Sequence, residues 1–499
     1  MSKSSTPSRQ SRSDIEKATV YQRYGLFIDG EWRQASSGNT EPVLNPFDGS
    51  ALGEIPCADA RDLDDALNSS QSGFRTWRAV SGWERAALLS RVAAEIRARA
   101  DEGARMMTLE TGKPLAEARG EFNAMAEQFD WYSGEACRVF GHTLDGRDAN
   151  TRLHVRFDPV GPVAAFTAWN FPGLLPARKI APALAAGCSI IVKPSEEAPF
   201  STYIMVEAVR AAGLPKGVLN VVTGKSTDIS AHLIASPIVR KVSLTGSVPV
   251  GKILLKLCAD GMKRVSMELG GHAPVLVFDD VDPVETGTLC ARTKFRNAGQ
   301  VCISPSRFYV HESIKASFEK AMADVAKSLR LGNGLDASTE FGPMANARGR
   351  ERAVSMVSDA VSRGATLQAG GSIPTSFPSG GFFFEPTVLG DVPEHAEIMT
   401  AEPFAPVAPV ASFKTFDEVI ERANNVPFGL AAYVFTSSLG TATRASEALE
   451  AGMVGVNDML LASAEVPFGG VKESGMGREG GQLGMRDYLE PKYIKLRIQ

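Results

Sequence analysis

Three residues combine a reactive side chain with a local sequence in which it could be used: Cys302, Glu268 and Asn170. Cys302 lies among Asn, Gly, Gln and Ser in KFRNAGQVCISPSR. This loop-forming context suits a partly exposed nucleophile, although a lone cysteine is commonly a small buried hydrophobe. Glu268 follows a short apolar run and precedes Gly-Gly, which suits a strand end at a cleft; the alternative is an ordinary surface Glu. Asn170 follows the apolar run AFTAW, so its amide could cap a turn or polarise a carbonyl.

Glycines 475, 477 and 480 spell G-x-G-x-x-G, the pattern of a dinucleotide-binding turn. Such a turn follows a strand, opens a helix and has an acid about 20 residues further on. The motif lies too close to the end of this sequence for a complete βαβ unit. We therefore interpret it as a glycine-rich loop near the mouth of an active site.

A second glycine motif, GSVPVGK at residues 246–252, matches G-x-x-x-x-G-K between a predicted strand and a predicted helix. A P-loop requires Ser or Thr next, because that hydroxyl binds magnesium, and Ile253 stands there instead. The arrangement still suits a phosphate at a helix N-terminus, with Pro249 in the first turn. It indicates a phosphate group, for example the pyrophosphate of a dinucleotide.

The composition is that of an ordinary globular enzyme-sized chain. The 499 residues are 44% hydrophobic and 22% charged, which predicts two or three domains. A formal net charge of -4 argues against nucleic acid or an anionic membrane as a partner. The six cysteines include no CxxC pair, so we expect a reducing compartment, the cytoplasm, and no metal site. No apolar stretch reaches the roughly 18 residues that a membrane helix needs.

The pattern of apolar residues predicts two α/β lobes that join near Gly270-Gly271. Residues 24–55 indicate short strands with a hairpin turn at Asp29-Gly30, and residues 59–138 indicate helices. From residue 160 onwards short apolar runs such as SIIVKP and KVSLTG alternate with amphipathic helices, which is typical of a parallel sheet.

Two segments outside this pattern, residues 151–157 and 494–498, alternate apolar and polar side chains. Both are expected to be half-buried strands. They pair across a subunit boundary in one interpretation, and are edge strands of one lobe in the other.

The motifs WNFP, KPSE, MELGG, GQVC and EPF, in that order, resemble the aldehyde dehydrogenase superfamily, as does the ending PFGGVKESGMGREGG. The resemblance runs from about residue 24 to the C-terminus. It implies an α/β aldehyde dehydrogenase-like fold with two Rossmann-like α/β lobes and a small β oligomerisation element. It divides the chain into a flexible N-terminal tail (1–20), an NAD-binding domain (21–145 and 158–270), a catalytic domain (271–470) and oligomerisation strands (146–157 and 480–499). It also implies a homo-oligomer, either a dimer or a tetramer.

The resemblance implies that Cys302 attacks the aldehyde carbonyl and forms a thiohemiacetal. The amide of Asn170 and the backbone N–H of Cys302 would hold the oxyanion. Glu268 would activate the water that hydrolyses the thioester formed after hydride transfer. Lys179 and Glu479 match positions that support this proton traffic.

For the cofactor, the resemblance places Lys193 and Glu196 beside the adenosine ribose. A carboxylate there accepts the 2′-hydroxyl and repels a 2′-phosphate, which favours NAD over NADP. Ser247 would meet the pyrophosphate, and Glu402 would hold the nicotinamide ribose beside Phe404. The implied cofactor-binding positions are Thr167, Ala168, Trp169, Lys193, Ser195, Glu196, Gly224, Gly246, Ser247, Val250, Leu269, Glu402 and Phe404.

Within the superfamily, ARKIAPALAAGC, TKFRNAGQVC and DYLEPKY are similar to succinate semialdehyde dehydrogenases. That branch grips the far carboxylate of its substrate with positions that map to Arg178, Arg296 and Ser463. A guanidinium fork matches a carboxylate or a sulfonate, whereas the alternative is that each arginine pairs with a local acid. The substrate is thus expected to be a small anionic aldehyde. Succinate semialdehyde, glutarate semialdehyde, 2-oxoglutarate semialdehyde and 3-sulfolactaldehyde all remain open.

Four departures from the family pattern affect this interpretation. Pro403 and Ala405 alter the loop that holds the nicotinamide ribose, and Val248 replaces the usual Thr after Gly-Ser. Ser304 stands where some succinate semialdehyde dehydrogenases have a second, redox-switching cysteine, so no such switch is expected. The loop MLLASAE is unlike the usual string at the substrate site.

Three rival functions remain as alternatives. A CoA-acylating aldehyde dehydrogenase does not need the hydrolytic acid, so Glu268 speaks against it. A non-catalytic binding protein on the same fold is disfavoured because Cys302, Glu268 and Asn170 are all present. A P-loop NTPase is the most distant alternative.

Overall fold

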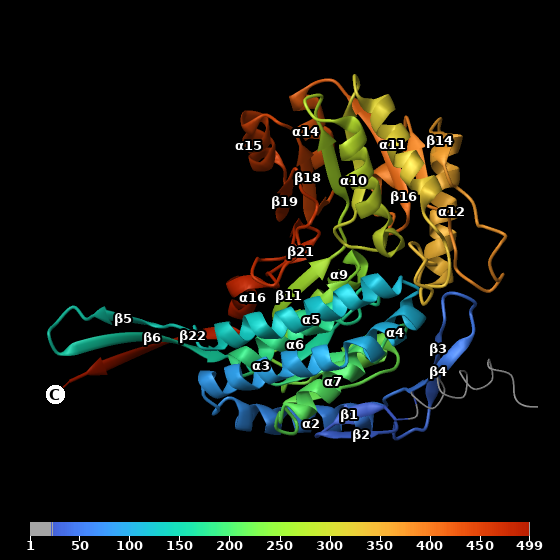
Figure 1. Ribbon diagram of the computed structural model, residues 1–499. Coiled ribbons are helices and arrows are strands. Elements are labelled where there is room, and N and C mark those ends of the chain that lie inside the picture. The colour runs from blue at the N-terminus through green and yellow to red at the C-terminus, as the bar shows by residue number, and fades with distance from the viewer. Residues whose placement is uncertain (1–20, 22, 499) are drawn as a thin grey trace, which may run out of the picture.

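A computed structural model describes residue 21 and residues 23–498, which form two α/β lobes and a projecting ribbon of strands (Figure 1). The predicted N-terminal tail of residues 1–20 lies outside the described residues. Two stacked lobes agree with the alternation of apolar strands and amphipathic helices in the sequence. Among the described residues, no helix combines the length and the apolar character needed to span a bilayer.

The first lobe contains an eight-stranded sheet whose central strands are short and buried on both faces. In sheet order its strands are β2 (Glu31–Arg33), β1 (Leu26–Ile28), β9 (Leu219–Val221), β8 (Ile190–Lys193), β7 (Val163–Phe166), β10 (Lys241–Gly246), β11 (Arg264–Leu269) and β21 (Gly475–Met476). The five strands from β9 to β11 are parallel, and β2, β1 and β21 are antiparallel to their neighbours. The hairpin turn at Asp29-Gly30 is confirmed: both residues adopt the positive φ that a tight turn between strands requires.

Helices cover both faces of this sheet, because successive strand residues point to opposite sides. Ala165 and Val192 pack on one helical layer, whereas Phe166 and Ile191 pack on the other. The first layer contains α3 (Gly82–Ala98), α4 (Ala100–Thr111), α5 (Leu115–Ala136), α6 (Leu174–Ala186) and α7 (Phe200–Ala211). The second layer contains α2 (Ala60–Trp77), α8 (Ser226–Ala235) and α9 (Val248–Asp260).

The second lobe is built in the same way around a seven-stranded sheet. In sheet order its strands are β14 (Thr366–Ala369), β15 (Thr387–Gly390), β16 (Val407–Phe413), β13 (Pro305–His311), β12 (Ala273–Val277), β18 (Ala431–Phe435) and β19 (Met453–Val456). Its helices are α10 (Pro283–Phe295), the 3-10 turn η1 (Arg296–Gly299), α11 (Lys315–Ser328), α12 (Ala347–Ser362), α13 (Glu397–Thr400), α14 (Phe416–Asn424) and α15 (Leu439–Ala448). Only β14 is antiparallel to its neighbour, so here too the carboxyl ends of the parallel strands share one edge.

The chain crosses between the lobes more than once. Residues 270–272 connect β11 to β12, and the segment after β19 returns to the first lobe to add β21 and α16 (Gly481–Arg486). Two short antiparallel pairs complete the fold: β3 (Thr40–Leu44) with β4 (Ala51–Pro56), and β17 (Phe428–Gly429) with β20 (Val471–Lys472). The sequence-based domain boundaries remain predictions, and β21 lies just beyond the limit of 470 that they give the second lobe.

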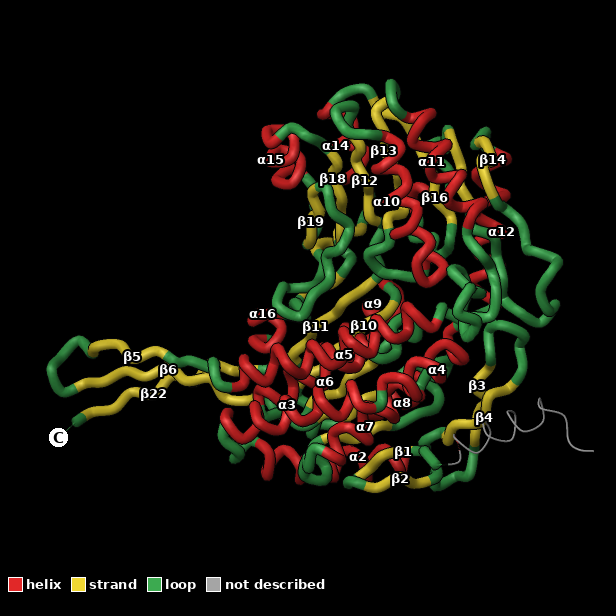
Figure 2. Tube along the Cα trace, in the orientation of Figure 1, coloured by secondary structure: helices red, strands yellow, loops and turns green. Residues whose placement is uncertain are grey.

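The ribbon consists of β5 (His142–Asp145), β6 (Thr151–Pro159) and β22 (Leu489–Arg497). It projects away from both lobes (Figure 2). The two segments singled out by their alternating pattern pair with each other inside one chain, in antiparallel register from Leu489↔Pro159 to Arg497↔Thr151. Residues 151–157 are half-buried, as predicted, whereas residues 495–498 are exposed. Leu144 and Tyr493, elsewhere in the ribbon, are exposed as well.

Candidate active site

A cavity of about 530 Å³ lies where the carboxyl ends of β7, β10 and β11 meet loops of the second lobe. Ligands of open α/β sheets characteristically bind at this edge. Its lining residues are Ala168, Trp169, Asn170, Thr245, Gly246, Ser247, Val248, Pro249, Glu268, Leu269, Gly270, Cys302, Arg352, Ala401, Glu402, Phe404 and Phe428. The structure therefore brings together Cys302, Glu268 and Asn170, which lie far apart in the sequence.

Cys302 is partly exposed in the turn that follows η1. The left-handed backbone of Asn297 and Ala298 shapes the approach to this turn. Burial, and then the adjacent Glu268 carboxylate, raise the pKa of the Cys302 thiol well above its ordinary value. The resting residue is therefore a protonated thiol, and its use as a nucleophile requires a base.

Glu268 is suited to act as that base. It ends β11, opposite Thr245 of β10, and neither of its buried carboxylate oxygens has a hydrogen-bond partner in the described structure. Burial and the Glu479 carboxylate raise its pKa to about 7, and Cys302, Lys179 and Arg178 limit the rise. A carboxylate with a pKa near neutrality is an effective proton acceptor at physiological pH.

Asn170 is fixed on both sides by buried polar groups. Its Nδ2 donates to the carbonyl of Gln300 at 3.1 Å. Its own carbonyl accepts from Lys113 Nζ at 2.8 Å and from Asn297 Nδ2 at 3.0 Å. Lys113 in turn pairs with Glu121 at 2.6 Å, and both side chains are fully buried. Sequence reasoning missed Lys113 and Glu121. Lys113 lies in the break between α4 and α5, Glu121 lies in an ordinary helical pattern, and no motif marks either residue.

The oxyanion site that the sequence predicts is geometrically available. The second hydrogen of the Asn170 amide is not used in the contact with Gln300. The backbone N–H of Cys302 makes no hydrogen bond within the described residues. Two donors beside the thiol are what a developing oxyanion requires.

Lys179 and Glu479 form a buried ion pair next to Glu268. Lys179 Nζ contacts Glu479 Oε1 and donates to Thr245 Oγ1 at 2.8 Å. Glu479 reaches this place from the glycine-rich loop beyond β21, whose Gly475 pairs with Glu268 at the edge of the sheet. A side chain at Gly475 would clash with the Met267 carbonyl, because its Cβ would lie 1.9 Å from that oxygen. The glycine-rich loop thus lies next to the candidate base.

The N-terminus of α9 faces the cavity. Ser247 is the N-cap residue, and no side chain caps the helix. Pro249 occupies the first turn, as the sequence predicts, and the free N–H groups of that turn can donate hydrogen bonds to an anion. The place of Gly246 and Ser247 in the lining of the cavity fits the expectation of a phosphate at this point.

Lys193 and Glu196 lie outside the cavity lining, at the carboxyl end of β8. Their charged groups are 2.5 Å apart, and Ser226 Oγ donates to Glu196 and accepts from Lys193. Burial alone would raise the pKa of Glu196, but Lys193 holds it below its ordinary value. Glu196 is therefore a carboxylate anion at neutral pH.

At the other end of the cavity Glu402 accepts a hydrogen bond from the Gly271 N–H at 3.1 Å. Burial raises the pKa of Glu402 to about 8. Phe404 packs edge-on against Trp169 with ring centroids 5.6 Å apart. Arg352 of helix α12 donates to the backbone carbonyl of Glu402 at 3.3 Å. The sequence did not single out this arginine.

The remaining predicted cofactor positions differ in how close they lie to the cavity. Leu269 and Ala168 line it, but Val250 lies exposed on α9. Thr167, Ser195 and Gly224 also lie outside the lining. They occupy the loops that follow β7, β8 and β9, at the same edge of the sheet.

None of the three predicted substrate residues lines this cavity. Arg178 is buried, its guanidinium lies 4.0 Å from the Phe468 ring, and its Nε has no partner. Its charge lowers the pKa of both Glu268 and Cys302, which places it near the reacting groups. Arg296 is exposed and lies 5.3 Å from the Phe171 ring, and Ser463 is half-buried. The structure thus places Arg178, more clearly than Arg296, next to the candidate nucleophile.

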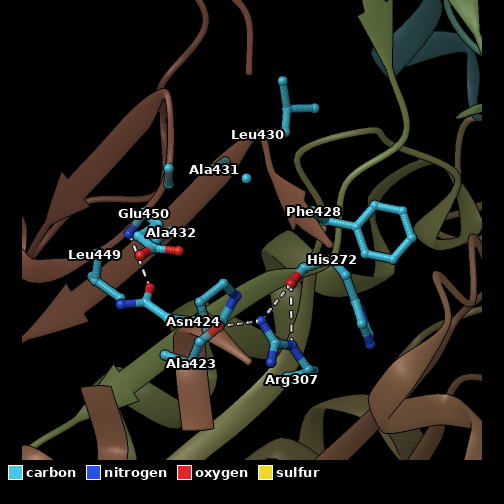
Figure 3. A pocket seen from close by; sticks show the side chains of 13 residues that line it. His272, Arg307, Ala423, Asn424, Phe428, Leu430, Ala431, Ala432, Leu449 and Glu450 are labelled. Atoms are coloured by element: carbon cyan, nitrogen blue, oxygen red, sulfur yellow. Dashed lines mark hydrogen bonds between the residues drawn. The ribbon is translucent and has the colours of Figure 1, made fainter. Parts of the chain in front are cut away.

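A second, very small cavity is lined by His272, a residue of the connection between the lobes (Figure 3). Arg307 is buried there and donates to the carbonyls of His272, Arg422 and Ala423. The cavity, with a volume of about 10 Å³, is too small for a substrate. Arg307 therefore has a structural role: it fixes the connection that follows Gly271.

Comparison with known proteins gives matches over nearly the whole chain. A family model described as the aldehyde dehydrogenase family matches residues 32–494. A 3-sulfolactaldehyde dehydrogenase of Pseudomonas putida is 45% identical over 94% of this chain and 96% of its own. A succinate-semialdehyde dehydrogenase of Escherichia coli, whose name specifies NADP(+), is 41% identical over 95% of this chain and 97% of its own. The crystal structure of betaine aldehyde dehydrogenase from Staphylococcus aureus in complex with NAD+ superposes with a TM-score of 0.93 at 34% identity, covering 97% of each chain.

Proposed function

Because the chain belongs to the aldehyde dehydrogenase family, we propose that it oxidises a short anionic aldehyde, of the succinate semialdehyde kind, to the carboxylic acid with NAD as the hydride acceptor. One observation carries this proposal. A thiol, a carboxylate with a pKa of about 7 and an amide donor converge on a single cavity at the carboxyl edge of the first sheet.

The first steps follow from these side chains. Glu268 takes the thiol proton of Cys302, and the sulfur then bonds to the aldehyde carbon. The carbonyl oxygen becomes an oxyanion, which the Asn170 amide and the Cys302 N–H stabilise. A bound nicotinamide would supply the hydride acceptor for the substrate carbon, and a thioester would then remain on the Cys302 sulfur.

Glu268 then releases the thiol proton to bulk water, which restores its carboxylate, and acts a second time. It removes a proton from a water molecule, the water oxygen bonds to the thioester carbon, and the carbon–sulfur bond breaks. The acid leaves and Cys302 is regenerated. A CoA-acylating enzyme would use the thioester differently and would not need this carboxylate, so the position of Glu268 beside Cys302 favours hydrolysis.

The family uses NAD or NADP, and the cavity fits such a dinucleotide. The uncapped N-terminus of α9 provides N–H donors for the pyrophosphate. Glu402 is held in place by Gly271, where it would bind the ribose of the nicotinamide half. Lys193 and Glu196, beyond the cavity, would meet the adenosine ribose.

The choice of NAD rests on Glu196. Replacing Glu196 by Gln should lower the KM for NADP by about tenfold and leave the KM for NAD nearly unchanged, because the variant removes the negative charge that repels a 2′-phosphate. Glu197→Gln is the matched control, since that neighbouring carboxylate binds Asn346 and Arg348 instead. Steady-state kinetics with both cofactors measure the effect. If Glu196→Gln leaves the preference between NAD and NADP unchanged, this carboxylate does not select the cofactor.

The proposal of an anionic substrate depends mainly on Arg178, and Arg296 and Ser463 would provide further contacts. Arg178 carries a buried guanidinium without an acidic partner among the described residues. A buried cation of this kind is stabilised when it binds an anion.

A panel of aldehydes tests this assignment. NADH absorbance should show kcat/KM at least about tenfold higher for semialdehydes that carry a carboxylate or a sulfonate than for neutral aldehydes of the same length. Arg178→Met should remove most of this preference, whereas Arg292→Met, an exposed arginine on α10, should not. Equal rates on charged and neutral aldehydes would exclude the anion site. The rates within the panel would also separate succinate, glutarate and 2-oxoglutarate semialdehydes from 3-sulfolactaldehyde.

We also propose that the chain works as a homo-oligomer, a dimer or a tetramer, in the cytoplasm. The exposed apolar residues of the ribbon, Leu144, Tyr493 and Leu496, support an interface between copies. All six cysteines are free thiols, which suits a reducing compartment.

A further inference from the structure

A buried ion pair between Lys113 and Glu121 lies beside the loop that carries Asn170, and the steps described above do not explain it. Its charged groups are 2.6 Å apart, and both side chains are only 1% exposed. An ion pair buried this deeply gains little stability over apolar side chains of the same size, because both charges lose their hydration. The pair therefore requires a reason other than stability.

Glu121 binds the start of helix α6, which follows Asn170 in the chain by a few residues. Its Oε1 accepts hydrogen bonds from the N–H groups of Gly173 and Leu174, at 2.8 and 3.1 Å. Gly173 is the N-cap residue of α6, and no side chain of α6 itself caps the helix. The carboxylate from α5 replaces the missing cap and is stabilised by the helix dipole. Glu121 thus fixes the far end of the loop of residues 170–174.

Lys113 binds the near end of the same loop. Its Nζ donates to the backbone carbonyl of Asn170 at 2.8 Å and lies 4.5 Å from the Phe171 ring. Hydrogen bonds from a charged donor are shorter and stronger than those between neutral groups. The ammonium group and the carboxylate of the pair therefore hold the two ends of the loop, and each fixes the other through their direct contact.

The backbone carbonyl of Asn170 also joins this loop to the turn that carries the nucleophile. Asn297 Nδ2 donates to the Asn170 carbonyl at 3.0 Å and to the Gln300 carbonyl at 3.2 Å. Asn170 Nδ2 donates to the same Gln300 carbonyl at 3.1 Å. Cys302 follows Gln300 by two positions. A few shared hydrogen bonds therefore set the place of the Asn170 amide relative to Cys302.

The turn before the nucleophile depends on contacts of this kind. Asn297 and Ala298 are consecutive non-glycine residues with φ angles of 48° and 52°. Such left-handed residues are strained and persist where neighbouring groups impose the conformation. Glu117 Oε2 accepts from the Asn297 N–H at 3.0 Å, and the Leu115 N–H donates to the Gly334 carbonyl of the second lobe at 2.9 Å. The start of α5 is therefore fixed to both lobes next to the site.

We propose that Lys113 and Glu121 are positioning residues, which hold the Asn170 amide where its free hydrogen meets the oxyanion formed on Cys302. The proposal rests on the proposed function, because only that reaction forms an oxyanion at this place. Neither residue of the pair lines the cavity, so both act through Asn170.

The accuracy of this placement decides how much the amide contributes. One hydrogen of the Asn170 amide is used by Gln300, and this bond fixes the direction in which the other hydrogen points. A misplacement of about 1 Å can reduce a catalytic rate about 10²-fold. Complete loss of one oxyanion donor costs about 10²- to 10³-fold. The pair should therefore affect the rate by as much as the amide contributes, and by no more.

The double variant Lys113→Met/Glu121→Gln tests this role. It removes both charges together, so no unpaired charge remains buried, and Gln keeps an oxygen for the N–H groups of α6. The matched control is Lys315→Met/Glu319→Gln, which removes a 2.8 Å ion pair of helix α11 whose side chains are 13% and 9% exposed. Stopped-flow absorbance measures the rate of first-turnover NADH formation, and fluorescence titration measures the binding of NAD.

The test variant should slow first-turnover NADH formation by about 10- to 100-fold and leave the Kd of NAD within about twofold of its original value. The control variant should change neither quantity. The deciding measurement combines the test variant with Asn170→Ala. If the pair acts through the amide, the combined variant should react no more than about twofold more slowly than Asn170→Ala alone, because the amide is already absent.

Losses that multiply in the combined variant would overturn the positioning role, since the pair would then act independently of Asn170. An unchanged first-turnover rate in the test variant would overturn it as well. If the double variant does not fold, Glu121→Gln alone is the milder test: it should slow the same step at least about threefold, with the same dependence on Asn170. Absence of aldehyde-dependent NADH formation in the unmodified enzyme would instead contradict the proposed function itself.

Discussion

Cys302→Ala is expected to abolish aldehyde oxidation, with NADH formation reduced by at least about 10⁴-fold, while NAD still binds. The substitution removes the atom that forms the covalent adduct, and no neighbouring group in the cavity replaces it. Binding of NAD should persist, because its proposed contacts come from α9, Glu196 and Glu402. Turnover is measured by NADH absorbance and cofactor binding by fluorescence titration.

Cys137→Ala is the control for this experiment. That cysteine is also a partly buried free thiol, but it ends helix α5 far from the cavity lining, beside the Gly82 carbonyl. It should retain the activity of the unmodified enzyme. If Cys302→Ala still turned over, the nucleophile would have to be another residue.

Glu268→Gln is expected to separate the two halves of the reaction. With a large excess of substrate, it should produce up to one NADH per subunit rapidly and then turn over about 10²- to 10⁴-fold more slowly than the unmodified enzyme. The thioester accumulates in this variant because no base activates water. Rapid-quench mass spectrometry would detect the acyl group on Cys302.

The rate of thioester hydrolysis in the unmodified enzyme should depend on pH through the ionisation of Glu268. Only the ionised carboxylate accepts a proton, so the hydrolytic rate should fall as the pH drops below about 7 and level off above it, following the pKa of Glu268. Glu268→Gln should lose this dependence. Glu110→Gln is the control, since Glu110 is also a buried carboxyl group with a pKa raised to about 8, but it binds Tyr21 and the Phe200 N–H outside the site. A normal acyl-enzyme lifetime in Glu268→Gln would show that another group is the hydrolytic base.

Much of the candidate site was accessible from the sequence because its members stand in short, distinctive motifs. Glycine lies close to both reactive residues: Gly270 follows Glu268 by two positions at the end of β11, and Gly299 precedes Cys302 by three positions at the end of η1. Glycine at the end of an element predicts a loop, and catalytic side chains are commonly found on loops. The hairpin at Asp29 and the alternation of strands and helices were also predictable, because turns and short elements are determined largely by residues that are adjacent in the sequence.

The supporting residues were not predictable in this way. Lys113 and Glu121 lie 8 positions apart around the start of a helix, and only the fold shows that both are buried beneath Asn170. Arg352 is one of several charged residues of α12, and nothing in the helical pattern distinguishes it from the others; Arg307 donates to carbonyls of distant loops. The pairing of residues 151–157 with 494–498 was also undecided, because an alternating pattern defines a strand but not its partner.

The order of elements at the end of the chain links assembly to catalysis. One continuous segment pairs with Glu268 at Gly475, supplies Glu479, turns through α16 and then becomes β22 of the ribbon. If copies associate through the ribbon, a neighbouring subunit restrains the same segment that places Glu479 near Glu268. The rate of each subunit then depends on the presence of its neighbour, and dilution below the association limit reduces specific activity without any change in the cavity itself.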